Sequence, residues 1–430
     1  MAGRTYRAGL KTVVVACLGV VVFVLLIFYG TGRWSQKPAA PAPRAAPSGQ
    51  WYRAVVRVNT TDIPFLLRLP REGGEGEGVI VNGREDIPVS VQSNESGRKL
   101  HFPHYGAWIE LTKAEDGALQ GTWTIQPLSG EQRSYSFRGR SIPEPLPELR
   151  FRSIKAGGVL TSDFSHVWRL DIEQFGVGRA IFRQSESGFV SGSIEWATGD
   201  LQSLSGLAKG RKLRLSHFDG GHGTYVELEH AADSDQFTGR VDSTHFGAFS
   251  LQGSRADEIT LESSTLTPGI EDIVSHIHSQ EPSEEGGTGT GMILALLDLD
   301  APASHGLMPL LKNLVQSQAI SGLRFVIRVT PPGEGNEAIS ERIAAFQTHH
   351  DLDWDVQALP RAWAAPLTDE RGRYPILPAL VFLAPGGAIV GHQLGFHSSA
   401  ATHSHAKVRR SIEAQLEAIV GAPSSEPAEP

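Results

Sequence analysis

Short alternating segments dominate this chain and limit what it can fold into. Between residues 50 and 256, apolar and polar residues alternate over stretches that Gly, Asp, Asn and Ser separate. Successive side chains of a strand point to opposite faces of a sheet, so this alternation predicts strands with one buried face. Many short strands with turns between them are typical of an all-β barrel or sandwich. The predicted strands include Trp51–Val58, Pro64–Leu69, Gly78–Val81, Ile87–Val91 and Trp168–Glu173.

The β region contains an internal repeat. The segment GRKLHFPHYG at Gly97–Gly106 recurs as GRKLRLSHFDG at Gly210–Gly220. Each copy leads through an alternating strand to a turn and a further strand, LQGTW at 119–123 and FTGRV at 237–241. This self-similarity predicts two related β units.

The C-terminal region has longer elements. The apolar segments Leu323–Val329 and Ala379–Leu383 predict buried strands, and Pro385-Gly386-Gly387 predicts a hairpin turn after the second. The segment Glu337–His349 predicts a helix, and about Ala406–Val420 predicts an amphipathic helix.

One segment of this region resembles the TlpA-type thioredoxin-like (redoxin) family. Residues 291–312, GMILALLDLDAPASHGLMPLLK, are similar to the family's first strand, active-site loop and first helix. The family has W-C-x-P-C-x-x-E-M-P where this chain has DAPASHGLMP. The shared Met308-Pro309 aligns Ala301 with the nucleophilic cysteine and Ser304 with the resolving cysteine. The resemblance covers roughly residues 288–421 and implies the thioredoxin order β-α-β-α-β-β-α.

Two more parts of the chain extend this resemblance. Residues 374–390, YPILPALVFLAPGGAIV, are similar to the family's G-x-P-T-x-F-L-I-D-x-x-G-x-I-V, and Pro378 falls on the family's cis-proline. The segments VSGSI, TGD and LRLSHFDGGH, within residues 165–242, resemble the β-domain that precedes the thioredoxin-like domain in many members. The chain departs from that pattern at 201–204, LQSL, where the family has an aromatic residue and an arginine.

This turn has no cysteine, so it cannot carry out the thiol chemistry of the family. A helix N-terminus lowers the pKa of a thiol and makes it nucleophilic, whereas the methyl group of Ala301 can attack nothing. The hydroxyl of Ser304 needs an adjacent base, and His305, the next residue, is expected to face elsewhere. We expect Ser304 to be a hydrogen-bonding residue at the helix N-terminus. The chain's single cysteine, Cys17, lies far away in sequence.

An apolar run near the N-terminus, Thr12–Gly30, is long enough to cross a bilayer. Basic residues before it predict that the N-terminus stays in the cytoplasm. The run therefore predicts an uncleaved signal anchor. The alternatives are a cleaved signal peptide and a lipoprotein modified at Cys17, although most of the apolar residues follow that cysteine. A Pro/Ala-rich linker, Lys37–Gly49, comes next.

Clusters of polar residues are candidate binding sites. The net charge of −8 and the lack of a basic stripe argue against nucleic acid. Turn and loop residues with incidental histidines are a simpler explanation of these clusters than metal ligands, so we predict no metal and no cofactor. Asp298 and Asp300 could bind a cation or act as acid and base, but solvated turn residues are the simpler interpretation. The histidine clusters are His104, His217, Asp219 and His222, and His392, His397, His403 and His405.

Together these patterns predict a multi-domain fold class: a single transmembrane helix, an all-β barrel or sandwich domain of two related units, and an α/β thioredoxin-like fold. The expected function is a redox-inactive binding or scaffolding module on the extracytoplasmic side of the inner membrane, with a protein or peptide partner. Peptide docking is expected at Pro302, Leu377 and Pro378. The alternatives are a thiol–disulfide oxidoreductase, which the resemblance implies, and ligand binding by the β-domain. The expected boundaries are 1–31 for the cytoplasmic tip and anchor, 32–50 linker, 51–256 β-domain, 257–290 linker, 291–421 thioredoxin-like domain and 422–430 tail.

Overall fold

Contacts divide the chain of the computed structural model into two units, residues 1–48 and 49–430, and only the second contains described residues. Among the described residues, no helix is both long and apolar enough to cross a membrane. The run Thr12–Gly30, with Cys17, lies outside them. The described residues are 49–71, 76–83, 85–94, 97–128, 130–145, 150–151, 162–232, 234–261, 268–280, 291–316, 323–329, 336–364, 367, 377–385 and 387–420.

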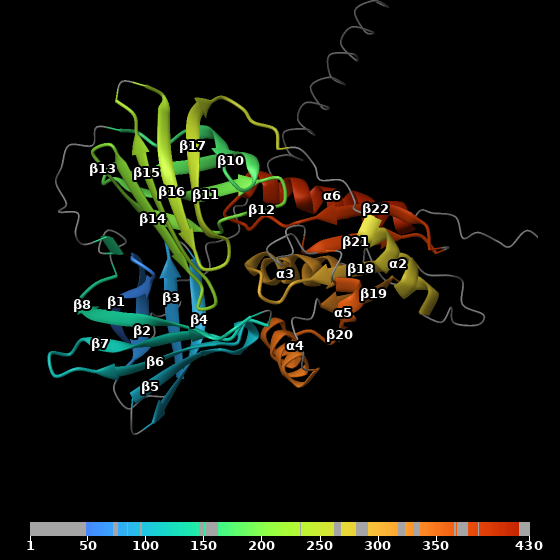
Figure 1. The fold of residues 1–430 in the computed structure, drawn as a ribbon, viewed down its shortest axis with the longest axis horizontal. Helices are drawn as coiled ribbons and strands as arrows, with labels where there is room; N and C mark the ends of the chain where they lie inside the picture. Colours follow the sequence, from blue (N-terminus) through green and yellow to red (C-terminus); the bar gives the residue numbers. More distant parts are fainter. Residues whose placement is uncertain are drawn as a thin grey trace, which may run out of the picture. The chain divides into compact units, whose positions relative to one another are not determined.

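The first eight strands form a closed antiparallel barrel, drawn in blue to teal in Figure 1. Alternate residues of the strands fill its core, as Tyr52, Ala54 and Val56 of the first strand show. The strands are β1 (Gly49–Val58), β2 (Thr61–Pro70), β3 (Gly76–Asn82), β4 (Glu85–Asn94), β5 (Gly97–Phe102), β6 (Ala107–Lys113), β7 (Leu119–Ile125) and β8 (Arg133–Ile142), with a short 3-10 helix, η2 (Pro103–Tyr105), before β6.

The next nine strands form a second sheet in the order β10-β9-β17-β16-β15-β14-β13-β11-β12. An additional pairing between β10 and β11 joins its two sides into a closed ring, with Trp168 and Phe237 in contact inside it. The strands are β9 (Val167–Ile172), β10 (Gly176–Gln184), β11 (Phe189–Trp196), β12 (Gly199–Asp200), β13 (Leu204–Lys209), β14 (Lys212–Phe218), β15 (Gly223–His230), β16 (Gln236–Ser243) and β17 (Gly247–Ala256).

The internal repeat occupies equivalent places in the two rings. Its first copy forms β5 and η2, and its second forms β14 and the turn that follows. Each copy therefore begins the last four strands of its ring. The rings pack together where Phe218 of β14 stacks on Phe65 of β2, with 4.2 Å between ring centroids. The buried Arg150 lies at the same junction and donates hydrogen bonds to the carbonyl oxygens of Pro64 and Ser216.

The C-terminal residues form a five-stranded sheet in the order β20-β19-β18-β21-β22. Its central strand, β18, is parallel to β19 and antiparallel to β21, and apolar cores cover both faces. The Leu377–Pro378 peptide bond before β21 is cis. The elements are α2 (Pro268–Gln280), β18 (Met292–Leu297), α3 (Pro302–Gln316), β19 (Arg324–Val329), α4 (Asn336–His350), β20 (Val356–Ala358), α5 (Arg361–Ala364), β21 (Ala379–Leu383), β22 (Ile389–Leu394) and α6 (Thr402–Val420).

The predicted fold class is wrong as a whole. The β region is two closed sheets rather than one domain, and it makes up most of the described structure. Together with the thioredoxin-like elements it belongs to a single compact unit, 49–430. No described helix fits the predicted transmembrane helix. The individual patterns fared better, since the predicted strands overlap β1–β4 and β9, and the expected order of elements is present between β18 and α6.

Candidate functional site

The two repeated turns meet each other above the loop that joins β18 to α3. The ring of Tyr105 from the first turn lies edge-on to His222 from the second, with centroids 4.8 Å apart. Glycines make this approach possible. A side chain at Gly220, whose φ is +93°, would overlap Phe102, and one at Gly221 would overlap the ring of Tyr105.

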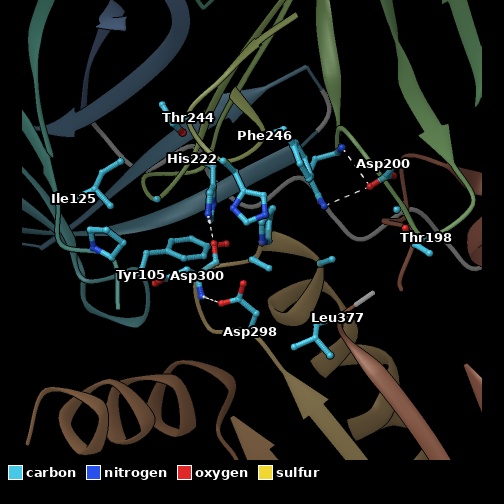
Figure 2. A pocket seen from close by; sticks show the side chains of 18 of the residues that line it. Tyr105, Ile125, Thr198, Asp200, His222, Thr244, Phe246, Asp298, Asp300 and Leu377 are labelled. Atoms are coloured by element: carbon cyan, nitrogen blue, oxygen red, sulfur yellow. Dashed lines mark hydrogen bonds between the residues drawn. The ribbon is translucent and has the colours of Figure 1, made fainter. Parts of the chain in front are cut away.

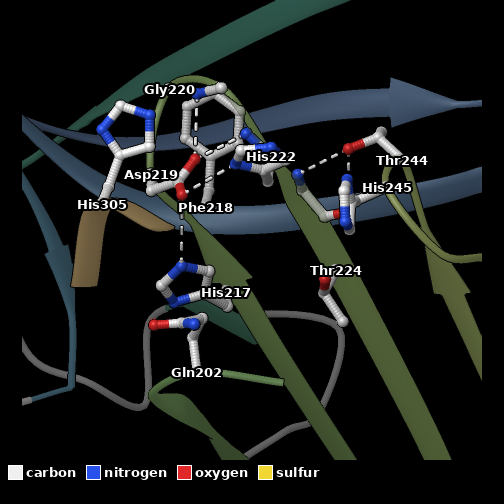
Figure 3. Close-up of polar contacts among 12 residues, drawn as sticks. Gln202, His217, Phe218, Asp219, Gly220, His222, Thr224, Thr244, His245 and His305 are labelled. Atoms are coloured by element: carbon white, nitrogen blue, oxygen red, sulfur yellow. Dashed lines mark hydrogen bonds and ion pairs between the residues drawn. The ribbon is translucent and has the colours of Figure 1, made fainter. Parts of the chain in front are cut away.

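Asp219 and His222 form the polar centre of the second turn (Figure 3). The backbone N–H groups of Gly221 and His222 donate to one oxygen of Asp219, and His222 Nδ1 lies 3.0 Å from the other. Burial disfavours a charged His222, but the Asp219 carboxylate outweighs it and raises the pKa of the imidazole. Burial likewise opposes the charge of Asp219, yet His222 and His217 hold its pKa well below the usual range.

His222 joins the repeated turn to the loop that resembles the active site. Its Nε2 lies 2.7 Å from the carbonyl oxygen of Asp300, the residue before Ala301. Both ring nitrogens therefore face acceptors, which is the arrangement that a charged, doubly protonated imidazole satisfies. His222, held by Asp219, thus fixes the second β sheet onto the thioredoxin-like loop.

Arg342 of α4 makes a second link between the same parts. Its side chain, 6% exposed, pairs with the Asp300 carboxylate. It also donates from Nε to the carbonyl oxygen of His104 (2.9 Å) and from Nη1 to that of Gln126 (3.2 Å). The other Asp300 oxygen accepts a hydrogen bond from the backbone N–H of Leu128 at 2.7 Å. One guanidinium therefore satisfies acceptors from the barrel and from the loop.

The positions aligned with the family's cysteines are both buried. Ala301 is 5% exposed and Ser304 is completely buried. The Ser304 hydroxyl accepts a hydrogen bond from the backbone N–H of Asp298 at 3.1 Å, so it holds the loop before the helix. His305 turns away, as expected: its Nε2 lies 3.0 Å from the carbonyl oxygen of Leu299, and its Nδ1 lies 3.1 Å from His350.

A cavity of about 230 Å³ lies between the two β rings and this loop (Figure 2). Its wall includes Ala301 and Pro302 from the loop and Leu377, the residue before the cis-proline. The remaining predicted docking residue, Pro378, is buried, and its carbonyl oxygen accepts a hydrogen bond from Gly395 N–H at 2.7 Å. The β rings contribute Tyr105, Ile125, Pro127, Arg133, Phe175, Trp196, Thr198, Gly199, Asp200, Gln202, Gly221, His222, Thr244, His245 and Phe246.

Two acids of the loop, Asp298 and Asp300, also line the cavity. One oxygen of Asp298 accepts a hydrogen bond from the backbone N–H of Asp300 at 2.9 Å. Burial, and next the neighbouring Asp300 carboxylate, raise the pKa of Asp298 to about 7. In the described part of the chain, no basic side chain forms an ion pair with it. Asp298 therefore holds a proton more readily than an ordinary aspartate does.

The two predicted histidine clusters lie in different parts of the structure. His104 stacks on His349, with centroids 3.6 Å apart, while His217 and His222 flank Asp219. In the C-terminal cluster, His397 Nε2 lies 2.8 Å from the carbonyl oxygen of Trp196. His392, His397 and His403 line one hollow beside α6, and His405 Nδ1 lies 2.9 Å from the carbonyl oxygen of His397. Among the residues that the structure describes, no group of three or more acidic, histidine or cysteine side chains is placed to hold a metal ion.

The TGD segment, too, lies at the junction with the C-terminal region. Asp200 accepts hydrogen bonds from the hydroxyl (2.6 Å) and the backbone N–H (3.1 Å) of Ser398. Sequence reasoning assigned these turn residues to the β fold alone and did not single out Arg342, Tyr105 or Trp196. The matching turns of the internal repeat could have indicated this site, because equivalent turns of two similar rings can meet at one place.

No family model and no curated protein matches this chain. Among solved structures, a thioredoxin-family thiol:disulfide interchange protein from Chlorobium tepidum matches at 12% identity and a TM-score of 0.23, covering 31% of this chain and 82% of that one. StoA from Bacillus subtilis matches at 14% identity and a TM-score of 0.21, covering 28% and 84%. A protein of unknown function from Nostoc punctiforme matches at 11% identity and a TM-score of 0.17, covering 49% and 96%.

The Chlorobium tepidum protein is a thiol:disulfide interchange protein of the thioredoxin family, and it and StoA each align with less than a third of this chain at low identity. They do not distinguish a TlpA-type member from other thioredoxin-like proteins. The strand order, the helices and the cis-proline carry the comparison of residues 291–420 with the thioredoxin fold.

Proposed function

We propose that this protein is a redox-inactive binding module whose ligand site is the cavity between the β rings and the altered loop. The observation that carries the proposal is the position of Ala301. Where the family resemblance places a reactive thiol, this chain has a methyl group in the wall of a cavity. A concave site with mixed apolar and polar walls is the usual form of a small-molecule site.

The β rings cover the loop, and this favours a small molecule rather than a folded protein as the ligand. His222 and Arg342 tie the β rings to Asp300, directly beside Ala301. A thiol–disulfide exchange partner has to bring its own sulfur to the nucleophile position. The bonds on either side of that position restrict access to molecules that fit the cavity.

The cavity also bears on the peptide-docking role expected for the cis-proline loop. Leu377 and Pro378 are buried, and Leu377 lines the cavity. A ligand that reaches this loop therefore enters the same space as one that contacts Ala301 and Pro302. Peptide docking at these residues remains a proposal for short, extended ligands.

Reduction assays test the redox part of the proposal. We expect the full-length chain to leave insulin disulfides intact. The Ala301→Cys/Ser304→Cys variant should react with a low-molecular-weight disulfide and still fail to reduce insulin, because the β rings exclude a protein substrate. Insulin reduction by the native chain would refute the redox-inactive function. Rapid insulin reduction by the double variant would show that the loop is an open docking surface.

We also propose that residues 49–430 act on the extracytoplasmic side of the inner membrane, where they contact a protein or peptide of the cell envelope. The support is the apolar run with basic residues before it. A reporter enzyme that works only outside the cytoplasm, fused after Ser48, should be active. A silent reporter, together with activity of a second reporter that works only in the cytoplasm and is fused at the same residue, would refute this orientation.

A further inference from the structure

We propose that the cavity binds a small organic cation, with the Asp298 carboxylate as its counter-ion and the aromatic rings of the second β ring as its walls. This inference rests on the proposed function that the cavity is a ligand site, and it adds the chemical class of the ligand.

The first argument is the balance of charge around the cavity. Asp300 pairs with Arg342, and Asp219 lies between His217 and His222. Asp200, also in the wall, accepts two hydrogen bonds from Ser398. These acids already have partners in the fold.

Asp298 differs from them. Its carboxylate accepts a hydrogen bond from the Asp300 backbone N–H, and within the described part of the chain no ion pair compensates its negative charge. The groups that act on it electrostatically are Asp300, His222 and Arg342, and the latter two are engaged by other acids. Arg133 lines the cavity but is exposed, and its Nη1 donates to the carbonyl oxygen of Thr244. A cationic ligand would supply the charge that this carboxyl lacks.

The second argument is the aromatic wall opposite the loop. Phe175 stacks on Trp196 with centroids 4.2 Å apart, and Phe246 lies edge-on to Trp196 at 5.2 Å. All three rings line the cavity together with Tyr105. Aromatic faces attract ammonium and guanidinium groups, and several rings around one cavity are a known arrangement for binding organic cations. The volume of about 230 Å³ lies below the range of roughly 300–1,000 Å³ found for drug-sized ligands, so the ligand must be small.

Binding and protonation are coupled in this site. The cation favours ionised Asp298, so its binding near neutral pH should release a proton from that carboxyl. Affinity should rise as the pH increases from about 6 to about 8, because less free energy is then spent on deprotonation. A ligand held by the aromatic rings alone would bind without such proton release.

Three compounds of similar size test the proposal: benzylamine, benzyl alcohol and benzoate. Calorimetry with the full-length chain, in two buffers of different ionisation enthalpy, measures affinity and proton release together. We expect benzylamine to bind, to release protons, and to bind at least ten times more tightly than the other two. Equal binding of the alcohol, preference for benzoate, or failure of all three to bind would overturn the proposal.

Variants separate the roles of the acid and the rings. Asp298→Asn should lower benzylamine affinity at least tenfold and abolish proton release, while the control Asp257→Asn, at an exposed site, should change neither. Phe246→Leu should weaken benzylamine several-fold and keep the proton release. Unchanged binding by Asp298→Asn would overturn the proposal. If that variant does not fold, proton release on benzylamine binding to the wild-type chain decides the test, and its absence would overturn the proposal. If the cavity admits small reagents but binds none of these compounds, the proposal of a cationic ligand is refuted, and the proposed function as a ligand site still stands.

Discussion

Replacing Arg342 by methionine should loosen the junction between the first barrel and the thioredoxin-like region. The arginine, 6% exposed, compensates the Asp300 carboxylate and donates to two barrel carbonyl oxygens, those of His104 and Gln126. Methionine keeps the apolar stem and removes the charge and the donors. The variant therefore isolates the polar contacts of this side chain.

The expected loss of stability is about 3–5 kcal/mol. Removing one partner of a buried ion pair costs about that much, because the remaining charge stays desolvated. A carbonyl oxygen left dry and without a donor would cost roughly 1–3 kcal/mol, but we expect water to reach the gap and bond to both, so the total stays at the value for the ion pair. The total is a large fraction of the roughly 5–15 kcal/mol that stabilises an ordinary fold.

Urea unfolding, followed by tryptophan fluorescence and circular dichroism, measures this effect. The matched control is Arg409→Met on α6, because Arg409 is exposed and pairs with Glu413 one turn away, a contact worth about 0.5 kcal/mol. A double-mutant cycle with Asp300→Asn should give a coupling energy above about 1.5 kcal/mol. If Arg342→Met loses less than about 1 kcal/mol, or if the two substitutions are additive, the junction does not depend on this contact.

Three further predictions concern the same region. Burial raises the pKa of Asp298 to about 7, above its ordinary 3.8, so the stability of the wild-type protein should fall as the pH rises between those values. Asp298→Asn should be about 1–3 kcal/mol more stable than wild type near pH 8 and equal to it near pH 4. A variant that is less stable than wild type at pH 8 would contradict this. Burial, and next His349, lower the pKa of His104 to about 2, and burial lowers that of His350 to about 3, so stability should be lost as the pH falls below about 6.5, where the unfolded chain takes up protons first. His350→Gln should reduce that loss by up to about 1.4 kcal/mol per pH unit in acid titrations, and an unchanged slope would count against it. Gly221→Ala should cost about 1–3 kcal/mol in urea unfolding, because its methyl group would overlap the ring of Tyr105. The control Gly130→Ala, whose methyl group would come no closer than 3.7 Å to another side chain, should cost less.

Much of the local structure could be predicted from sequence because it depends on local patterns. Alternation located β1 and β2, and the apolar segment at 379–383 coincides with β21. The repeat likewise predicted related units. Closure of each ring could not be predicted, since the pairing of β1 with β8 joins residues far apart in sequence and has no local pattern.

The site shows the same division. The loop resemblance identified Ala301 and Pro302, which do line the cavity, but not the groups that complete it. In the sequence, nothing distinguishes Trp196 and Phe246 from other strand and turn residues, or Arg342 from the other charged residues of its helix. Their role arises only when three sheets meet, so it depends on packing between distant segments.

The most direct test of the account is the reactivity of a thiol placed at the wall of the cavity. In the full-length Cys17→Ser chain, the Ala301→Cys variant should react quickly with N-ethylmaleimide and at least a hundred times more slowly with the same maleimide group on a large polyethylene glycol. A ligand of the cavity should slow the fast reaction. Equal reaction with both reagents would mean that the loop is open surface, and reaction with neither would mean that no accessible cavity exists there; either result contradicts the account.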